Sequence, residues 1–240
     1  MNIKKLISKI TGYWLHKTTT LPIGVDLFYD INDRLEFGEL KTVFDVGANE
    51  GQTLNWVKHH QPAATLHSFE PVEKSFLKLK AMALKRPGCT VVHTALGAEK
   101  GSMDIKLFEE HSVLNSLKPG LMNHEVNAKT ETIQIIRLDS YCMANNINRI
   151  DLLKIDTEGF ELEVLQGAGK MLDDGSISFI YAEVGFQSQN TRNTRFKELI
   201  HFLEPKGFLF YALYQLDAHE WKTGNHLGNA LFVHRNIYPS

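Results

Sequence analysis

The chain has few cysteines and no long apolar run. Only Cys89 and Cys142 occur among 240 residues, and they lack the CxxC spacing of a zinc or redox site. They fit no disulfide framework, which favours a reducing compartment, so we expect a cytoplasmic protein. No uninterrupted apolar run approaches the roughly 20 residues that are needed to span a bilayer.

The chain also lacks an excess of positive charge. Its 26 Lys and Arg residues face 28 Asp and Glu residues, for a net charge of −2, and both signs are mixed along the sequence. Proteins that bind a phosphate backbone usually carry an extended basic field, so we expect no nucleic-acid partner. The 11 histidines show neither HxxxH nor HxH spacing, which gives no support to a histidine metal site.

One amphipathic segment stands at the N-terminus. The apolar residues among the first sixteen follow helical spacing, and the lysines fall largely elsewhere around the helix. We expect a helix over residues 1–16, within an N-terminal region of residues 1–40, that packs on its own domain or on a second subunit. Peripheral contact with an anionic membrane surface is the alternative, because basic amphipathic helices bind such surfaces.

From residue 41 onward, short apolar runs alternate with segments of helical spacing. The expected strands are 42–47, 64–71, 89–97, 150–156, 177–185, 207–214 and 229–235, and the expected helices are 52–60, 72–85, 161–172 and 195–204. This alternation is typical of a doubly wound α/β sheet with helices on both faces. The last two strands have no good helix between them, which indicates an antiparallel final strand. We predict a single domain over residues 41–240 with a Rossmann-like, mostly parallel, seven-stranded sheet. Residues 101–141 hold the strand-like segments MDIKLF and TIQIIRL around a polar loop, and we expect a β insertion there.

The first expected strand runs into a glycine-bearing turn, GANEG, before a helix. In an open α/β sheet, ligands bind at the carboxyl ends of the strands, and glycine lets the backbone approach them closely. The turn lacks the GxGxxG pattern of dinucleotide sites, and its acids suit a cationic ligand better than a pyrophosphate. S-adenosylmethionine, with its sulfonium and ammonium groups, fits that chemistry. The predicted cofactor-binding residues of this segment are Asp45, Gly47, Ala48, Asn49, Gly51 and Gln52.

The second expected strand ends in Phe69-Glu70-Pro71. A carboxylate at this position accepts hydrogen bonds from both ribose hydroxyls of a cofactor, and proline helps to start the next helix. We predict ribose binding by Glu70, next to Pro71; the alternative is a carboxylate that only stabilises a helix N-terminus. Ala95 and Leu96, at the end of the third expected strand, are predicted to flank the adenine.

The segment KIDTEGFE is a strand followed by an acid-rich turn and a helix. Asp156 and Glu158 fall at the carboxyl edge of the sheet, and Glu183 ends the next strand, so we predict that these three catalytic carboxylates share one cleft. Like charges held close raise one another's pKa, and such a carboxylate can act as general base for an alcohol. Asp156 is also predicted to contact the cofactor. For Glu161 we favour a simple helix-terminus role.

These motifs resemble the FkbM-type methyltransferases, a class I family. Its pattern of DVGAN-G, FEP and K-D-EG-E is matched by DVGANEG, FEP and KIDTEGFE, within roughly residues 43–233. The resemblance implies methylation of hydroxyl groups on polyketides, sugars or glycan chains, with a small-molecule or glycan substrate. It also implies S-adenosylmethionine binding by the residues matching Asp45, Gly47, Asn49, Gly51, Glu70 and Asp156.

Three alternatives stay open at this point. A non-catalytic binding or scaffold protein can keep the same fold, because fold does not imply activity. An NAD-dependent oxidoreductase is less favoured because the third glycine of its fingerprint is missing. A divalent metal such as magnesium, held by Asp156, Glu158 and Glu183, is also less favoured, and we assign no metal site.

Overall fold

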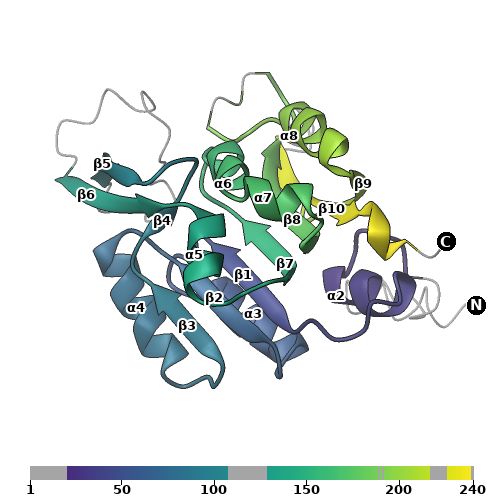
Figure 1. Ribbon diagram of the computed structural model, residues 1–240, viewed down its shortest axis with the longest axis horizontal. Helices are drawn as coiled ribbons and strands as arrows, with labels where there is room; N and C mark the ends of the chain where they lie inside the picture. The colour runs from purple at the N-terminus through teal and green to yellow at the C-terminus, as the bar shows by residue number, and fades with distance from the viewer. Residues whose placement is uncertain (1–20, 108–128, 189, 191, 217–225, 239–240) are drawn as a thin grey trace, which may run out of the picture.

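The computed structural model describes residues 21–107, 129–188, 190, 192–216 and 226–238 (Figure 1). The helix predicted over residues 1–16 lies outside these residues. No helix in the described part of the chain is both long and apolar enough to cross a membrane.

A seven-stranded sheet forms the centre of the molecule (Figure 1). Its strands are β1 (Thr42–Val46), β2 (Thr65–Phe69), β3 (Cys89–Val92), β7 (Ile150–Ile155), β8 (Ile177–Gly185), β9 (Phe208–Tyr214) and β10 (Leu227–His234). They lie in the order β3-β2-β1-β7-β8-β10-β9. The first five of these are parallel, and β10 runs antiparallel to both of its neighbours. The predicted sheet, with its antiparallel last strand, is confirmed.

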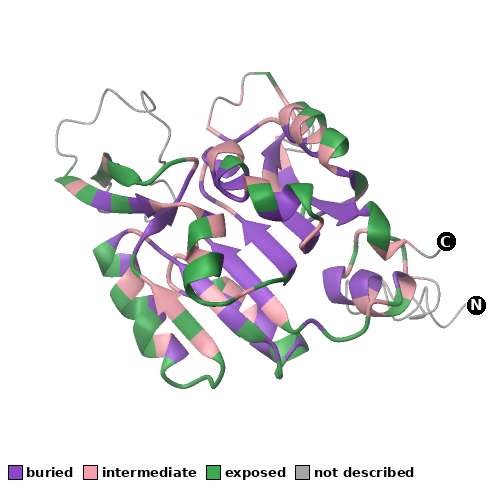
Figure 2. Ribbon diagram, in the orientation of Figure 1, coloured by how far each residue is buried: buried purple, intermediate pink, exposed green. Residues whose placement is uncertain are grey.

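Helices pack on both faces of this sheet. Two apolar clusters arise because successive strand side chains point to opposite faces: Leu152 belongs to one cluster and Leu153 to the other. The helices of the first face are α2 (Leu27–Tyr29), α3 (Gln52–His60) and α4 (Glu73–Ala83), and those of the second are α5 (Leu138–Ala144), α6 (Glu161–Gly167), α7 (Gly169–Asp173) and α8 (Phe196–Leu203). Figure 2 shows the central strands buried between them, as expected of parallel strands covered on both faces.

A second, three-stranded sheet lies beside the first. It consists of β4 (Ala95–Leu96), β5 (Gly101–Leu107) and β6 (Lys129–Ile136) in the order β4-β6-β5. The strands β5 and β6 pair antiparallel, within the segment where we expected an insertion, and α5 follows from Leu138.

Two expected elements are each divided in the structure, so their predicted bounds are wrong. The run 89–97 bends after Val92, because the Thr94 hydroxyl donates a hydrogen bond to Gln134 O of β6, 2.9 Å away, and Ala95–Leu96 joins the second sheet. The helix expected over 161–172 breaks at Ala168, between two glycines. Gly167 packs there directly against backbone, since a Cβ would lie 2.1 Å from Gly97 O.

Candidate active site

A pocket of about 270 Å³ opens at the carboxyl ends of β1, β2 and β7. The chain leaves β1 towards β2 on one side and β7 lies on the other, so the pocket occupies the topological switch point of the sheet, where open α/β sheets bind ligands. Predicted site residues that line it are Gly47, Ala48, Asn49, Gln52, Glu70, Pro71, Ala95, Leu96, Asp156 and Glu158. Lining polar residues that we had given no role are Thr53, Ser75, Lys154 and Thr157.

The turn after β1 brings backbone against backbone. The amides of Gly47 and Ala48 donate to Phe69 O at 3.1 and 3.0 Å. Gly47 has a φ of +78°, and a Cβ there would lie 1.9 Å from Asp156 O. Glycine is therefore required both by the left-handed conformation and by the close approach of the loop after β7.

Gly51 has a different place from the one predicted. It has a φ of +102° before α3, and its Cα faces α4, where a Cβ would meet Met82 Sδ at 2.8 Å. Gly51 is not among the residues that line the pocket, and glycine at this place lets α3 pack on α4; a contact between Gly51 and the cofactor stays a prediction.

Glu70 is a buried carboxylate on the pocket wall, 6% exposed. It accepts a hydrogen bond from Asn49 N at 2.9 Å and another from Val72 N at 2.8 Å. Burial raises the pKa of Glu70 to about 7, although the two amides oppose the shift. Glu70 thus joins the turn after β1 to the start of α4, and each oxygen keeps a lone pair for a further donor.

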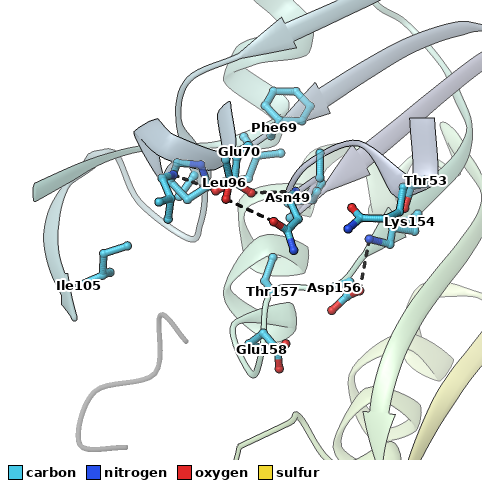
Figure 3. Close-up of a pocket in the computed structure, with 18 residues that line it drawn as sticks. Asn49, Thr53, Phe69, Glu70, Leu96, Ile105, Lys154, Asp156, Thr157 and Glu158 are labelled. Atoms are coloured by element: carbon cyan, nitrogen blue, oxygen red, sulfur yellow. Dashed lines mark hydrogen bonds and ion pairs between the residues drawn. The ribbon is translucent and has the colours of Figure 1, made fainter. Parts of the chain in front are cut away.

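Asp45 is connected to the pocket through two lining residues, Lys154 and Thr53. Asp45 is completely buried and does not line the pocket, whereas Lys154 lines it and lies 3.2 Å from Asp45 and 3.4 Å from Asp156. Burial raises the pKa of Asp45, against the effect of the nearby ammonium. Burial also opposes the charge of Lys154, but Asp45 and Asp156 together hold its pKa above the ordinary lysine value. In Figure 3, Lys154 and Asp156 lie on one side of the pocket and Glu70 with Asn49 on another.

The three carboxylates predicted to share a cleft do lie together. One oxygen each of Asp156, Glu158 and Glu183 lies within 4.8 Å of the others, although Glu183 does not line the pocket. Burial, opposed by Arg192 at 2.6 Å and assisted by Asp156, raises the pKa of Glu158 to about 7. Burial and the neighbouring carboxylates raise the pKa of Glu183 further above its ordinary value. The raised pKa favours the protonated form of Glu183.

The segment after β8 supplies partners that sequence reasoning missed. Arg192 forms an ion pair with Glu158, and Asn193 Nδ2 donates a hydrogen bond to Glu183. Asn190 Oδ1 accepts from the amides of Arg192 and Asn193 at 3.1 and 3.0 Å, which folds the segment. The available signal was the polar run at 190–195, which has no periodicity. Arg192 and Lys154 place positive charge beside Glu158 and Asp156.

The apolar wall of the pocket comes from both sheets. Phe69 ends β2 of the large sheet, and Leu96 and Ile105 belong to β4 and β5 of the small one. Ala95 and Leu96 line the pocket as predicted, but from the small sheet rather than from the end of the third strand.

A family model described as the Methyltransferase FkbM domain matches residues 45–210. The chain belongs to the FkbM methyltransferase family. The predicted family, the S-adenosylmethionine-dependent class I fold and the general activity of a methyltransferase are confirmed by this match and the strand order. Membership also argues against the NAD-dependent alternative.

Three curated methyltransferases are similar to the chain at 26–28% identity. "Methyltransferase 1" of Beauveria bassiana is 26% identical over 184 residues, 70% of this chain and 70% of that protein. "31-O-demethyl-FK506 methyltransferase FkbM" of Streptomyces tacrolimicus is 27% identical, over 52% of this chain and 58% of its own length. "Hexuronic acid methyltransferase AglP" of Haloferax volcanii is 28% identical, over 62% and 58%. The chain thus spans little more than half of the last two.

Solved methyltransferase structures are also similar to the chain. The precorrin-6y C5,15-methyltransferase of Geobacter metallireducens has a TM-score of 0.46 at 10% identity, over 86% of this chain and 87% of that one. TrmK of M. capricolum, in complex with S-adenosyl-homocysteine, has a TM-score of 0.48 at 11% identity, over 88% and 69%.

Proposed function

We propose that the protein transfers the methyl group of S-adenosylmethionine to a hydroxyl oxygen of a saccharide or secondary metabolite. The observation that carries this proposal is that one pocket is lined both by Glu70, suited to a ribose, and by Asp156 and Glu158, suited to a hydroxyl acceptor. Two relatives support the acceptor class, because their names specify 31-O-demethyl-FK506 and hexuronic acid.

The cofactor contacts follow from the lining. Glu70 would accept hydrogen bonds from the ribose hydroxyls. Asn49 and the small residues Gly47 and Ala48 leave room for the ligand beside Glu70. The apolar side at Ala95, Leu96 and Ile105 takes the adenine ring, with Pro71 nearby, and Gln52 and Thr53 extend the polar side. When bound, S-adenosylmethionine supplies a methyl group activated by the positive sulfur. Lys154 holds Asp156 by an ion pair on the side of the pocket away from Glu70.

Glu158 is the best placed of the three carboxylates to act as general base. It lines the pocket, and its pKa of about 7 matches the pH at which a base accepts a proton most effectively. In the transfer, Glu158 would take the proton of the acceptor hydroxyl, whose oxygen would receive the methyl group that the bound cofactor supplies. Asp156 orients the acceptor, and the raised pKa of Glu183 favours its uncharged form, which limits the repulsion in the cluster.

The proposal is tested with S-adenosylmethionine that carries a deuterated methyl group. Hexuronic acids, neutral sugars and macrolides with free hydroxyls are offered, each paired with an amino analogue of the same skeleton, and the methyl position is located by mass spectrometry and NMR. We expect label on a hydroxyl oxygen and not on the amine.

The Glu158→Gln variant tests the base. Removing a general base typically lowers turnover by about 10²–10⁴-fold, and we expect a loss of that size with little change in cofactor binding. Lys197→Gln, a change in the first turn of α8, is the control and should retain full turnover. Label on nitrogen, or a Glu158→Gln enzyme that is as fast as the wild type, contradicts the proposal.

A further inference from the structure

Glu161 is a fully buried carboxylate, 0% exposed, that the proposed reaction does not use. It is the first residue of α6. Its Oε1 accepts three hydrogen bonds: from Thr157 N at 3.0 Å, from Thr157 Oγ1 at 3.0 Å and from Gly159 N at 3.1 Å. Its Oε2 accepts a fourth from Thr194 N at 3.3 Å. Glu161 lies in the first turn of α6, as predicted from the sequence, but all these donors lie outside α6.

The hydrogen bonds to Oε1 of Glu161 hold the turn at residues 156–159 in a strained backbone conformation. Glu158 and Gly159 have φ values of +55° and +103°, and a left-handed glutamate persists only where its surroundings impose it. The bonds from Thr157 and Gly159 to Glu161 fix the residues on both sides of Glu158. Without that carboxylate, buried donors on both sides would be left without an acceptor.

The second oxygen holds the segment after β8. Thr194 donates its amide to Glu161, and its carbonyl accepts from Gly185 N at 2.9 Å, at the end of β8. The two residues before Thr194 are Arg192 and Asn193, whose side chains contact Glu158 and Glu183. One carboxylate thus connects the turn after β7 with the segment after β8, and both carry groups of the acid cluster.

We propose that Glu161 is a positioning residue that holds the turn at residues 156–159 and the segment at 192–194 as one unit. The unit sets the separation of Asp156, Glu158 and Glu183 and the shape of the pocket wall at Thr157. This inference rests on the proposed function of the pocket. If Glu161 only stabilised the helix terminus by its charge, any carboxylate near that terminus would suffice. Positioning, in contrast, needs a side chain long enough to reach both segments.

Two variants separate the effect of side-chain length from the effect of charge at Glu161. Glu161→Gln keeps the length but removes the charge and turns one acceptor into a donor, and Glu161→Asp keeps the charge but is shorter by one methylene. The control is Glu163→Gln, two residues further along α6 and half-buried. For each full-length protein, amide hydrogen exchange is followed by NMR at Thr157, Gly159 and Thr194, and S-adenosylhomocysteine binding is measured by calorimetry.

We expect both Glu161 variants to exchange at least about tenfold faster at these three amides, because each loses hydrogen bonds to a charged acceptor, and to bind S-adenosylhomocysteine about tenfold more weakly. Exchange in the middle of β7 and β8 should match the wild type, and Glu163→Gln should change neither quantity.

If Glu161→Asp behaves like the wild type, the effect belongs to charge and the inference is overturned. Unchanged amide exchange in both variants would also overturn it. Uniformly faster exchange across the sheet would overturn it as well, because Glu161 would then be a general stabiliser of the fold. If the wild type itself fails to bind S-adenosylhomocysteine, the proposed function fails, whereas the exchange pattern still decides whether Glu161 holds the two segments.

Discussion

Lys154 is the buried cation on which the acids around the pocket depend. Its ammonium lies 3.2 Å from Asp45 and 3.4 Å from Asp156, and only 8% of the side chain is exposed. Taking charges out of water costs free energy, which a buried pair offsets only while both partners are present. Loss of Lys154 leaves Asp45 as a fully buried carboxylate without its ion-pair partner, next to a second acid.

We therefore expect Lys154→Met to lower the free energy of unfolding by about 3–5 kcal/mol, the usual cost of breaking a buried pair. The control is Lys206→Met, since Lys206 pairs at 2.7 Å with Asp173, whose side chain is 65% exposed, and such a surface pair contributes about 0–1 kcal/mol. Urea unfolding measures both variants. The double variant Lys154→Met with Asp45→Asn should recover part of the loss; a cost below about 1 kcal/mol for Lys154→Met alone would contradict this account.

The glycine turn after β1 shows how one element depends on another that is distant in sequence. The turn follows β1, but its glycine is required by Asp156 O, which follows β7. Gly38 provides a comparison in the same conformation, since it has the same φ of +78° with nothing within 4 Å of an added Cβ.

We expect Gly38→Ala to cost only the strain of a left-handed alanine, about 1–2 kcal/mol. Gly47→Ala should cost clearly more and weaken S-adenosylhomocysteine binding, because the turn must move away from the loop after β7. Thermal unfolding and calorimetry measure the two effects. Equal stabilities for the two variants would show that the close approach at Gly47 carries no cost.

Elements whose local sequence pattern agrees with their tertiary environment could be predicted from the sequence. The bounds of α3 and β8 match the expected runs, and the acids at 156, 158 and 183 meet because parallel strands end at one edge of a sheet. Bends of the chain that depend on partners distant in sequence could not be predicted from the sequence. The chain leaves the third strand because of the Thr94 bond to Gln134 O, and nothing near Thr94 in sequence indicates that partner.

The same limit explains the missed site residues. A lysine within a buried strand, as Lys154 is, gives no signal of its two acidic partners until the strands are placed side by side. Arg192 and Asn193 lie in a segment without periodicity, and Glu161 showed only its position at the start of a helix. The separate parts played by Asp45 and Gly51 also follow from packing, because side chains and neighbouring helices decide what reaches the pocket.

At the scale of the whole molecule, several buried carboxylates are concentrated at one edge of the sheet. Burial raises the pKa of Glu70 and of Glu158 to about 7. A carboxyl whose pKa is higher in the folded than in the unfolded state stabilises the fold at pH values below its unfolded pKa, and that contribution is lost as the pH rises through the folded pKa. The ligand-free protein should therefore lose stability through neutral pH.

Glu70→Gln isolates one of these contributions. For a pKa near 7, the group should remove about 1 kcal/mol of stability between pH 6 and pH 8 in the wild type, and the variant should lack that part of the change. Urea unfolding at the two pH values, with Glu73→Gln on the exposed start of α4 as control, measures the difference. An identical pH dependence in wild type and Glu70→Gln would mean that Glu70 titrates at an ordinary pKa.

We propose above that the pocket at the carboxyl edge of the sheet binds S-adenosylmethionine through Glu70. The most direct test of this proposal is calorimetric titration of the full chain with S-adenosylhomocysteine, in parallel with NAD and with a Glu70→Ala variant. We expect saturable binding of S-adenosylhomocysteine, no binding of NAD, and loss of at least about tenfold in affinity in Glu70→Ala, because the ribose hydroxyls lose a charged acceptor. A folded wild type that binds NAD instead, or a Glu70→Ala variant that binds S-adenosylhomocysteine as tightly as the wild type, would contradict the account.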